Sequence, residues 1–142
     1  MSGNGWTARF PADWELQRAA VRLAAERPDG AESVAVATFP LRRPFRADLW
    51  DEAVAELDVV ARDLAQELSA LAQLSNGSNT SIDGRRARSY EIRYERNGIP
   101  LIERVAFVFE GRREFQLTCR IDEREPEPGE AACSELLGSF AL

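Results

Sequence analysis

The chain has 142 residues, of which 44% are hydrophobic and 30% are charged, a composition typical of one globular domain spanning residues 1–142. Its formal net charge is −6, which argues against nucleic acid and anionic membranes as partners, because both attract clustered cationic side chains. The sequence contains no histidine, and all 18 basic residues are arginine. Imidazole acid–base catalysis, histidine metal ligands and lysine Schiff-base chemistry are therefore excluded.

The N-terminal residues and the apolar runs bear on where the protein works. No basic stretch followed by an apolar run is present near the N-terminus, and every apolar run is shorter than the roughly 20 residues that a membrane span needs. These patterns predict a bacterial, cytoplasmic protein without stable membrane insertion. Cys119 and Cys133 are then expected to be reduced, buried thiols. A disulfide between them would require Cα atoms within about 7 Å of each other.

The N-terminal stretch "RFPADW" marks the end of a first strand. Apolar and polar residues alternate over residues 6–10, which predicts a strand there. Pro11 cannot donate a ladder hydrogen bond and confines Phe10 to extended geometry, so the strand should end at this pair. Trp14 is then expected to fold back onto the core as an apolar lid rather than to form a binding rim.

Two further strands are predicted before residue 41. Residues 16–25 are compatible with a helix or a strand, because alanine is frequent there and the alternation is imperfect. A strand is favoured, since the Pro28-Asp29-Gly30 turn is followed by a second strand pattern over residues 33–40. The two runs are expected to form a hairpin.

Residues 48–74 show the periodicity of a long amphipathic helix. The apolar residues at spacings of three and four are Trp50, Ala53, Leu57, Ala61, Leu64, Leu68 and Leu71. Asp48 is the predicted N-cap. The helix is expected to stop at Ser75-Asn76-Gly77, within a polar surface loop at residues 75–81.

The C-terminal half predicts an antiparallel meander and a closing helix. Its strands cover residues 87–96, 99–110 and 114–122, with Asn97-Gly98 as the first turn. A short helix follows within residues 130–142. The predicted fold class is α+β: a single domain with an antiparallel sheet of about six strands, packed by one long mid-chain helix and a short C-terminal helix.

The order of these elements resembles that of a known family. The segments that carry the likeness are "RFPADW", "LWDEAVAELDVVARDL", the meander "DGRRARSYEIRYERNGIPLIERVAFVFEGRREFQLTCRI" and "CSELLGSF". Together they resemble the PsbP-like superfamily, in its bacterial DcrB-like branch. The resemblance implies a sheet sandwiched by helices and non-catalytic work, and it supplies no catalytic residues. It also implies protein binding, as in a photosystem subunit, a factor for the small GTPase Ran, and the Eag chaperones of type VI secretion effectors.

The meander turns define an expected strand register. If Gly111-Arg112-Arg113 forms a three-residue loop, Cys119 lies opposite Glu103 on the apolar face of the sheet. A catalytic interpretation of that pair is weak, because a reactive thiolate needs a nearby cation or imidazole and a carboxylate disfavours it. We therefore expect Glu103 to be structural, at the open end of the sheet and either hydrated or paired with an arginine.

The same register defines a candidate partner-binding face. This face carries mixed polar and small apolar side chains, which suit a peptide groove and an ordinary solvated face equally well. The predicted partner-binding residues are Arg93, Ile102, Arg104, Val108, Gln116 and Thr118. A second basic run, Arg85, Arg86 and Arg88, fits an anion site or a solvated strand start, and the solvated strand start is preferred.

The predicted function is a non-enzymatic protein-binding module, a cytoplasmic chaperone or adaptor for a hydrophobic or amphipathic segment of another protein. No metal-ligand spacing, catalytic triad or phosphate loop is present, and no cofactor is expected. A homodimer is an open possibility. The alternative is a carrier of a small hydrophobic ligand, with a cavity between helix and sheet lined by Tyr90, Tyr94 and Phe107. A cavity of several hundred Å³ would support the carrier, and a closed core would oppose it.

Overall fold

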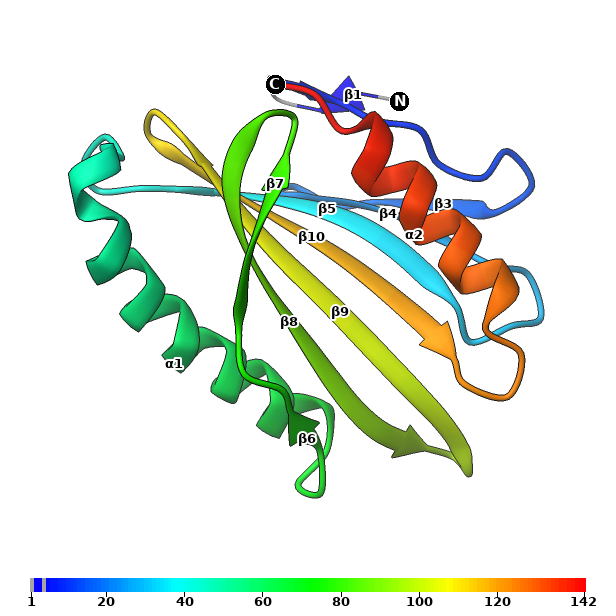
Figure 1. Ribbon diagram of the computed structural model, residues 1–142. Coiled ribbons are helices and arrows are strands. Elements are labelled where there is room, and N and C mark those ends of the chain that lie inside the picture. The colour runs from blue at the N-terminus through cyan, green and yellow to red at the C-terminus, as the bar shows by residue number, and fades with distance from the viewer. Residues whose placement is uncertain (1, 4) are drawn as a thin grey trace.

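A computed structural model describes residues 2–3 and 5–142 (Figure 1). The strands are β1 (Ser2–Gly3), β2 (Trp6–Thr7), β3 (Glu15–Arg18), β4 (Arg22–Glu26), β5 (Ser33–Pro40), β6 (Gln73–Leu74), β7 (Ser78–Ile82), β8 (Arg85–Arg96), β9 (Ile99–Glu110) and β10 (Arg113–Asp122). The helices are the 3₁₀ turn η1 (Ala47–Leu49), α1 (Trp50–Leu68) and α2 (Glu127–Ser139). The predicted α+β fold class is confirmed, with a long helix in the middle of the chain and a short helix at the C-terminal end.

One antiparallel sheet organises the molecule. Its described strands follow the order β3-β4-β5-β10-β9-β8, and β6 and β7 both pair with β8 at that edge. Among the described residues this sheet has eight strands, whereas about six were expected. Asn97 and Gly98 have positive φ angles of 53° and 79°, as a two-residue hairpin turn requires. The strong turn signal in the sequence is therefore confirmed.

The two faces of the sheet carry separate cores. On the face toward α2, Cys133, Leu136 and Phe140 pack with the N-terminal Trp6 and Trp14 over β5 and β10. On the face toward α1, the core is a cluster of helix and strand side chains. Its buried members are Leu57, Ala61, Ala65, Tyr90, Ile92, Tyr94, Leu101, Val105 and Phe107. We call the first surface the α2 face and the second the α1 face.

The N-terminal region differs from its predicted extent. The expected strand over residues 6–10 is reduced to β2, but Phe10 and Trp14 are buried as predicted. The backbone N–H of Trp14 donates to the Pro11 carbonyl at 3.2 Å, which closes the turn. The run 16–25 divides into β3 and β4, and the expected hairpin between β4 and β5 is confirmed.

The long helix is shorter than its apolar stripe suggests. It begins after η1, with Leu49 as N-cap and no side-chain capping bond, so the Asp48 cap is wrong. It ends at Leu68, because Ser69 is extended at φ −167° and ψ 142°. The predicted loop at residues 75–81 is also wrong, because most of it belongs to β7. That strand is polar and exposed except for Ile82, so it lacks the apolar alternation that reveals a half-buried strand.

The β9–β10 turn overturns the predicted register. It is a two-residue turn in which Glu110 pairs with Arg113, and Gly111 supplies the positive φ of 59°. The register therefore moves by one residue relative to the predicted three-residue loop, which places every β10 side chain on the other face relative to β9. Cys119 lies opposite Arg104 rather than Glu103, so the predicted Glu103–Cys119 pair is wrong.

The expected free thiols are also wrong. Cys119 and Cys133 form a disulfide with their Cα atoms 5.6 Å apart, and the structure describes no free cysteine. The bond joins β10 to α2, and both residues are buried. Helix and strand approach closely because Gly129 has no side chain; a Cβ there would lie 2.9 Å from the Ile121 Cγ1 atom.

Candidate functional site

The structure separates the residues that the sequence placed on one binding face. Gln116 and Thr118 lie on the α1 face, because they follow the parity of β10 opposite to Leu117 and Cys119. The other four predicted residues lie on the α2 face and are Arg93, Ile102, Arg104 and Val108. The expectation of one shared surface is therefore wrong, whereas the binding roles themselves stay predictions.

Two of the predicted residues are inside the protein. Val108 is 0% exposed and Ile102 is 8% exposed. Val108 belongs to the core that α2 and the N-terminal segment cover. A partner could contact Val108 only after that cover moved, and Ile102 exposes little surface, so the two side chains do not form a docking surface in this conformation.

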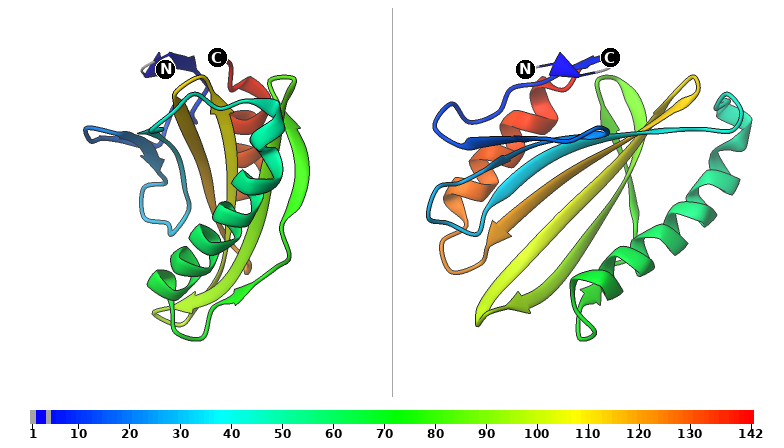
Figure 2. Two further views of the ribbon diagram at one scale, coloured as in Figure 1. Left: turned by 90° about the vertical axis from the view of Figure 1, so that its left-hand side faces the viewer. Right: turned by 180° about the vertical axis from the view of Figure 1, so that it is seen from behind.

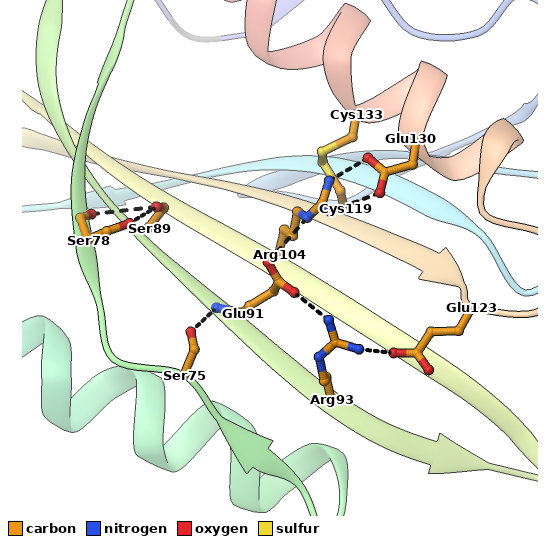
Figure 3. A network of polar contacts seen from close by, with 10 residues as sticks. All are labelled: Ser75, Ser78, Ser89, Glu91, Arg93, Arg104, Cys119, Glu123, Glu130 and Cys133. Carbon is orange, nitrogen blue, oxygen red and sulfur yellow. Dashed lines mark hydrogen bonds and ion pairs between the residues drawn. A yellow bond between two sulfur atoms is a disulfide. The ribbon is translucent and has the colours of Figure 1, made fainter.

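Arg93 and Arg104 lie in a ladder of ion pairs on the α2 face (Figure 3). Arg104 makes two hydrogen bonds to Glu130, at 2.6 and 2.8 Å, and its Nε lies 3.7 Å from Glu91. Arg93 lies 2.6 Å from Glu123 and 3.3 Å from Glu91. The hydrogen bonds that Arg104 donates to Glu130 raise the pKa of Arg104 above its ordinary value. Both guanidinium groups are thus already neutralised and do not favour an anionic ligand.

A small trough adjoins this ladder. It has a volume of about 230 Å³ and is bounded by β7 and α2. The hydroxyl oxygens of Ser78 and Ser89 lie 3.1 Å apart at its β7 side, while Ala106, Leu117 and Cys119 contribute an apolar side. The Cys119–Cys133 disulfide therefore ties α2 to the sheet beside this trough (Figure 3).

Two neighbouring hollows lie on the α1 face. The first part has a volume of about 470 Å³, and the second part about 240 Å³. The two parts follow each other along one side of α1 and along β10, and we call them the α1 groove. Residues of the first part include Glu52, Glu56, Val60, Phe109 and Glu114. The second part is lined by Leu64, Glu67, Leu68, Ile92, Glu103, Val105, Gln116 and Thr118.

The position of α1 explains why this groove is open. The helix packs against β8 and β6 at one side of the sheet. In the right-hand view of Figure 2, no described helix lies in front of β5 and β10 on this face. Predicted residues Gln116 and Thr118 thus form the sheet-side wall of a groove whose other wall is helical.

A buried polar network lies at the floor of the groove. Arg120 donates to both carboxylate oxygens of Glu103, at 2.8 and 3.2 Å, and the Tyr94 hydroxyl donates to Glu103 at 3.1 Å. Glu103 is 7% exposed. Burial, followed by the Glu103 charge, raises the pKa of Tyr94 to about 12. The expectation that Glu103 pairs with an arginine is confirmed.

Glu114 lies at the sheet side of the groove, and its side chain makes no hydrogen bond or ion pair with another described residue. Burial is the main cause that raises its pKa above the ordinary value, and the negative charge of Glu56 across the groove adds to it. Two carboxylates that face each other disfavour each other's ionised form. The sequence offered one signal for these acidic residues, since Glu52, Glu56 and Glu67 flank the apolar stripe of α1 at helical spacing, but Glu114 came near them only through the fold.

The aromatic residues of the carrier alternative pack in the core under α1, and Tyr90 also borders the trough beside β7. Phe107 is fully buried, and Tyr90 and Tyr94 belong to the same core under α1. The Tyr90 hydroxyl donates to Asp58 of α1. Burial, followed by this bond, raises the pKa of Tyr90 to about 12. The space between helix and sheet is therefore filled at these three positions.

The basic residues after the β7–β8 turn all contact other side chains of the protein, which is consistent with a structural role at the start of β8. In order, Arg85 lies 2.7 Å from Glu110, Arg86 lies over the Trp50 ring, and Arg88 donates to Asn79 at 3.0 Å. Across the described chain, no group of three or more cysteine, aspartate or glutamate residues is arranged to hold a metal ion. Over the same residues, no helix is long and apolar enough to cross a bilayer.

Comparisons with known proteins find likeness in structure but not in sequence. No protein-family model matches the chain, and no curated protein sequence matches it. The solution structure of the cyanobacterial PsbP (CyanoP) of Synechocystis has a TM-score of 0.64 at 14% identity, covering 98% of this chain and 87% of that one. LpqN, involved in cell envelope biogenesis of Mycobacterium tuberculosis, has a TM-score of 0.58 at 15% identity, covering 96% and 82%.

A third solved structure is larger than this protein. It comes from Bacteroides thetaiotaomicron and has a TM-score of 0.63 at 10% identity. The match covers 96% of this chain but only 44% of the Bacteroides chain. At such low identities the three likenesses bear on the fold alone. They support one statement, which is that this chain has a PsbP-like fold.

Proposed function

We propose that this chain is a non-enzymatic protein-binding module, a chaperone or adaptor that holds a segment of a partner protein in the α1 groove. The observation that carries the proposal is the groove itself, which combines an apolar helical wall at Leu64 and Leu68 with a polar sheet wall at Gln116 and Thr118. Mixed walls of this kind suit an amphipathic segment. We also propose that residues 1–142 form one domain. Within the proteins of PsbP-like fold, we propose that the chain is related to the DcrB-like branch.

The chemistry of the groove supports binding over catalysis. Glu103 is its most buried acid, but Arg120 neutralises it through two hydrogen bonds, which opposes a role as general base. Both cysteines are consumed in the disulfide, and the sequence has no histidine. These features leave no activated nucleophile among the described residues.

The disulfide changes the compartment that we propose. Disulfides persist in oxidising surroundings and are uncommon in a reducing cytoplasm. The Cys119–Cys133 bond therefore supports an oxidising compartment over the cytoplasm expected from the sequence. The PsbP-like fold fits this proposal, since LpqN is described as involved in cell envelope biogenesis.

Site-specific photocrosslinking in the source organism tests the proposed function. A photoreactive residue would replace Gln116 or Thr118 in the groove, and Ser134 on the exposed side of α2 as a matched control. We expect both groove positions to capture one common protein, through one segment, and excess wild-type protein to compete. The proposal would be abandoned if Ser134 captured the same protein equally well, or if the two groove positions captured nothing in common.

A further inference from the structure

The α1 groove has an uneven distribution of charge. Glu52, Glu56 and Glu114 line its first part, and Glu67 lines its second part. Within the described chain, Glu56, Glu67 and Glu114 make no hydrogen bond or ion pair, and Glu52 only approaches Arg43 at 3.9 Å. From Glu56 onward, these three carboxylates therefore line the groove without a counter-ion among the described residues.

The remaining charges in the groove do not alter this balance. Arg42 and Arg43 lie at the end formed by the loop after β5, beside Glu52. Glu103 lies deeper and is already paired with Arg120. The groove is thus cationic only at its loop end. A segment bound along it would meet unpaired carboxylates over most of its length.

Glu56 and Glu114 face each other across the first part of the groove. The pKa of Glu114 is raised, by burial and then by Glu56. A cation between the two carboxylates would favour the ionised form of both, so its binding and their ionisation support each other. This geometry favours a cationic ligand group and disfavours a carboxylate or phosphate.

Apolar surface in the same groove indicates the rest of the ligand. Val60 is 37% exposed and lines the first part, and Leu64 and Leu68 line the second. The floor is formed by strand side chains such as Phe109 and Val105. A small inorganic cation would leave these apolar surfaces wet, whereas a peptide carrying apolar side chains would cover them.

We propose that the segment held in the α1 groove is cationic and amphipathic, with apolar side chains against Val60, Leu64 and Leu68 and with lysine or arginine side chains paired to Glu56, Glu67 and Glu114. This rests on the proposed function, because it names the partner chemistry of the same groove. Glu56 and Glu67 lie about 16 Å apart along the helix, at 1.5 Å per residue. An extended segment covers that distance in about five residues, which sets the spacing of its cations.

Three synthetic peptides of about twelve residues test the inference. They share alternating leucine and differ at the intervening positions, which carry lysine, glutamine or glutamate. Binding to the isotopically labelled full chain is followed by NMR, at low and at high salt. We expect the lysine peptide to bind tightest, to shift the amides around Glu56, Glu67 and Gln116, and to weaken as salt rises.

Matched variants separate the groove from the overall charge. Glu56→Gln and Glu114→Gln each remove one charge inside the groove, whereas Asp63→Asn removes one from the exposed side of α1. We expect each groove variant to weaken the lysine peptide about three- to tenfold, as for partly shielded ion pairs. Asp63→Asn should change it less than about twofold. Thermal unfolding of each variant confirms that the chain remains folded.

The outcomes distinguish the two proposals. Equal binding of the glutamine and lysine peptides in the groove would refute the cationic partner and leave the protein-binding function standing. The same refutation follows if Asp63→Asn weakens binding as much as Glu56→Gln, since the attraction would then belong to the net charge. If no peptide shifts any groove amide, the proposed function fails together with the inference.

Discussion

Reduction of the Cys119–Cys133 disulfide should measurably destabilise the protein. The two cysteines are 14 positions apart, so the bond closes a loop of about 15 residues, for which chain entropy gives roughly 3 kcal/mol at 25 °C. In a chain of this size a loss of that order lowers the melting temperature by about 10 °C. The loss should appear in the unfolding of the whole domain, because the bond restricts the unfolded chain.

The assay is urea unfolding followed by circular dichroism, with and without a dithiol reductant. The matched control is the double variant Cys119→Ala/Cys133→Ala, which cannot respond to reductant and should resemble the reduced wild type, apart from a small cavity term. Thiol titration of the unfolded, unreduced protein should detect no free thiol. Two free thiols, or a wild-type midpoint that ignores the reductant, would refute the reasoning and restore the reduced cysteines expected from the sequence.

Three further predictions follow from buried side chains. Trp14→Ala should cost about 3–5 kcal/mol, because the ring is only 9% exposed; unchanged stability with lost partner binding would instead restore a binding rim at "RFPADW". Glu103→Gln should cost about 1–3 kcal/mol by leaving the Arg120 charge buried without its partner, and a gain in the unfolding free energy would contradict that account. Glu114→Gln should stabilise the protein at pH 7 by less than about 1 kcal/mol. The pKa of Glu114 is raised in the folded protein, so the stability of the wild type falls as the pH rises through that pKa. An equal gain in stability at pH 4, where Glu114 is mainly protonated, would contradict this explanation.

Local sequence signals predicted most of the elements for identifiable reasons. The apolar stripe from Trp50 onward produced α1, and Asn97-Gly98 produced the β8–β9 hairpin with both positive φ angles. The edge strand β7 escaped notice because both of its sides are polar and exposed, so it has no apolar alternation to read. Gly111 also indicated the two-residue β9–β10 turn, because glycine at the first of the two central positions is one of the patterns favoured in such turns.

The candidate site was less accessible to sequence reasoning than the fold. A shift of one residue at the β9–β10 turn placed Gln116 and Thr118 on the α1 face and left Arg93 and Arg104 on the α2 face. Alternation along one strand shows which of its residues point to the same face of the sheet. It does not show which residues of the next strand point to that face, because this depends on the register between the strands. The predicted binding residues therefore came from two surfaces.

The amino-acid sequence by itself determined the α+β class, the amphipathic helix, the meander and its tightest turn, because each depends on residues within a few positions of one another. Only the tertiary structure decided which residues from distant segments meet. It brought Cys119 to Cys133, Arg120 to Glu103, and Glu114 opposite Glu56. The α1 groove has the same origin, since it exists because α1 packs at the β8 side and leaves β10 open. Strand register and helix placement are set by the packing of the whole chain, and no local pattern encodes them.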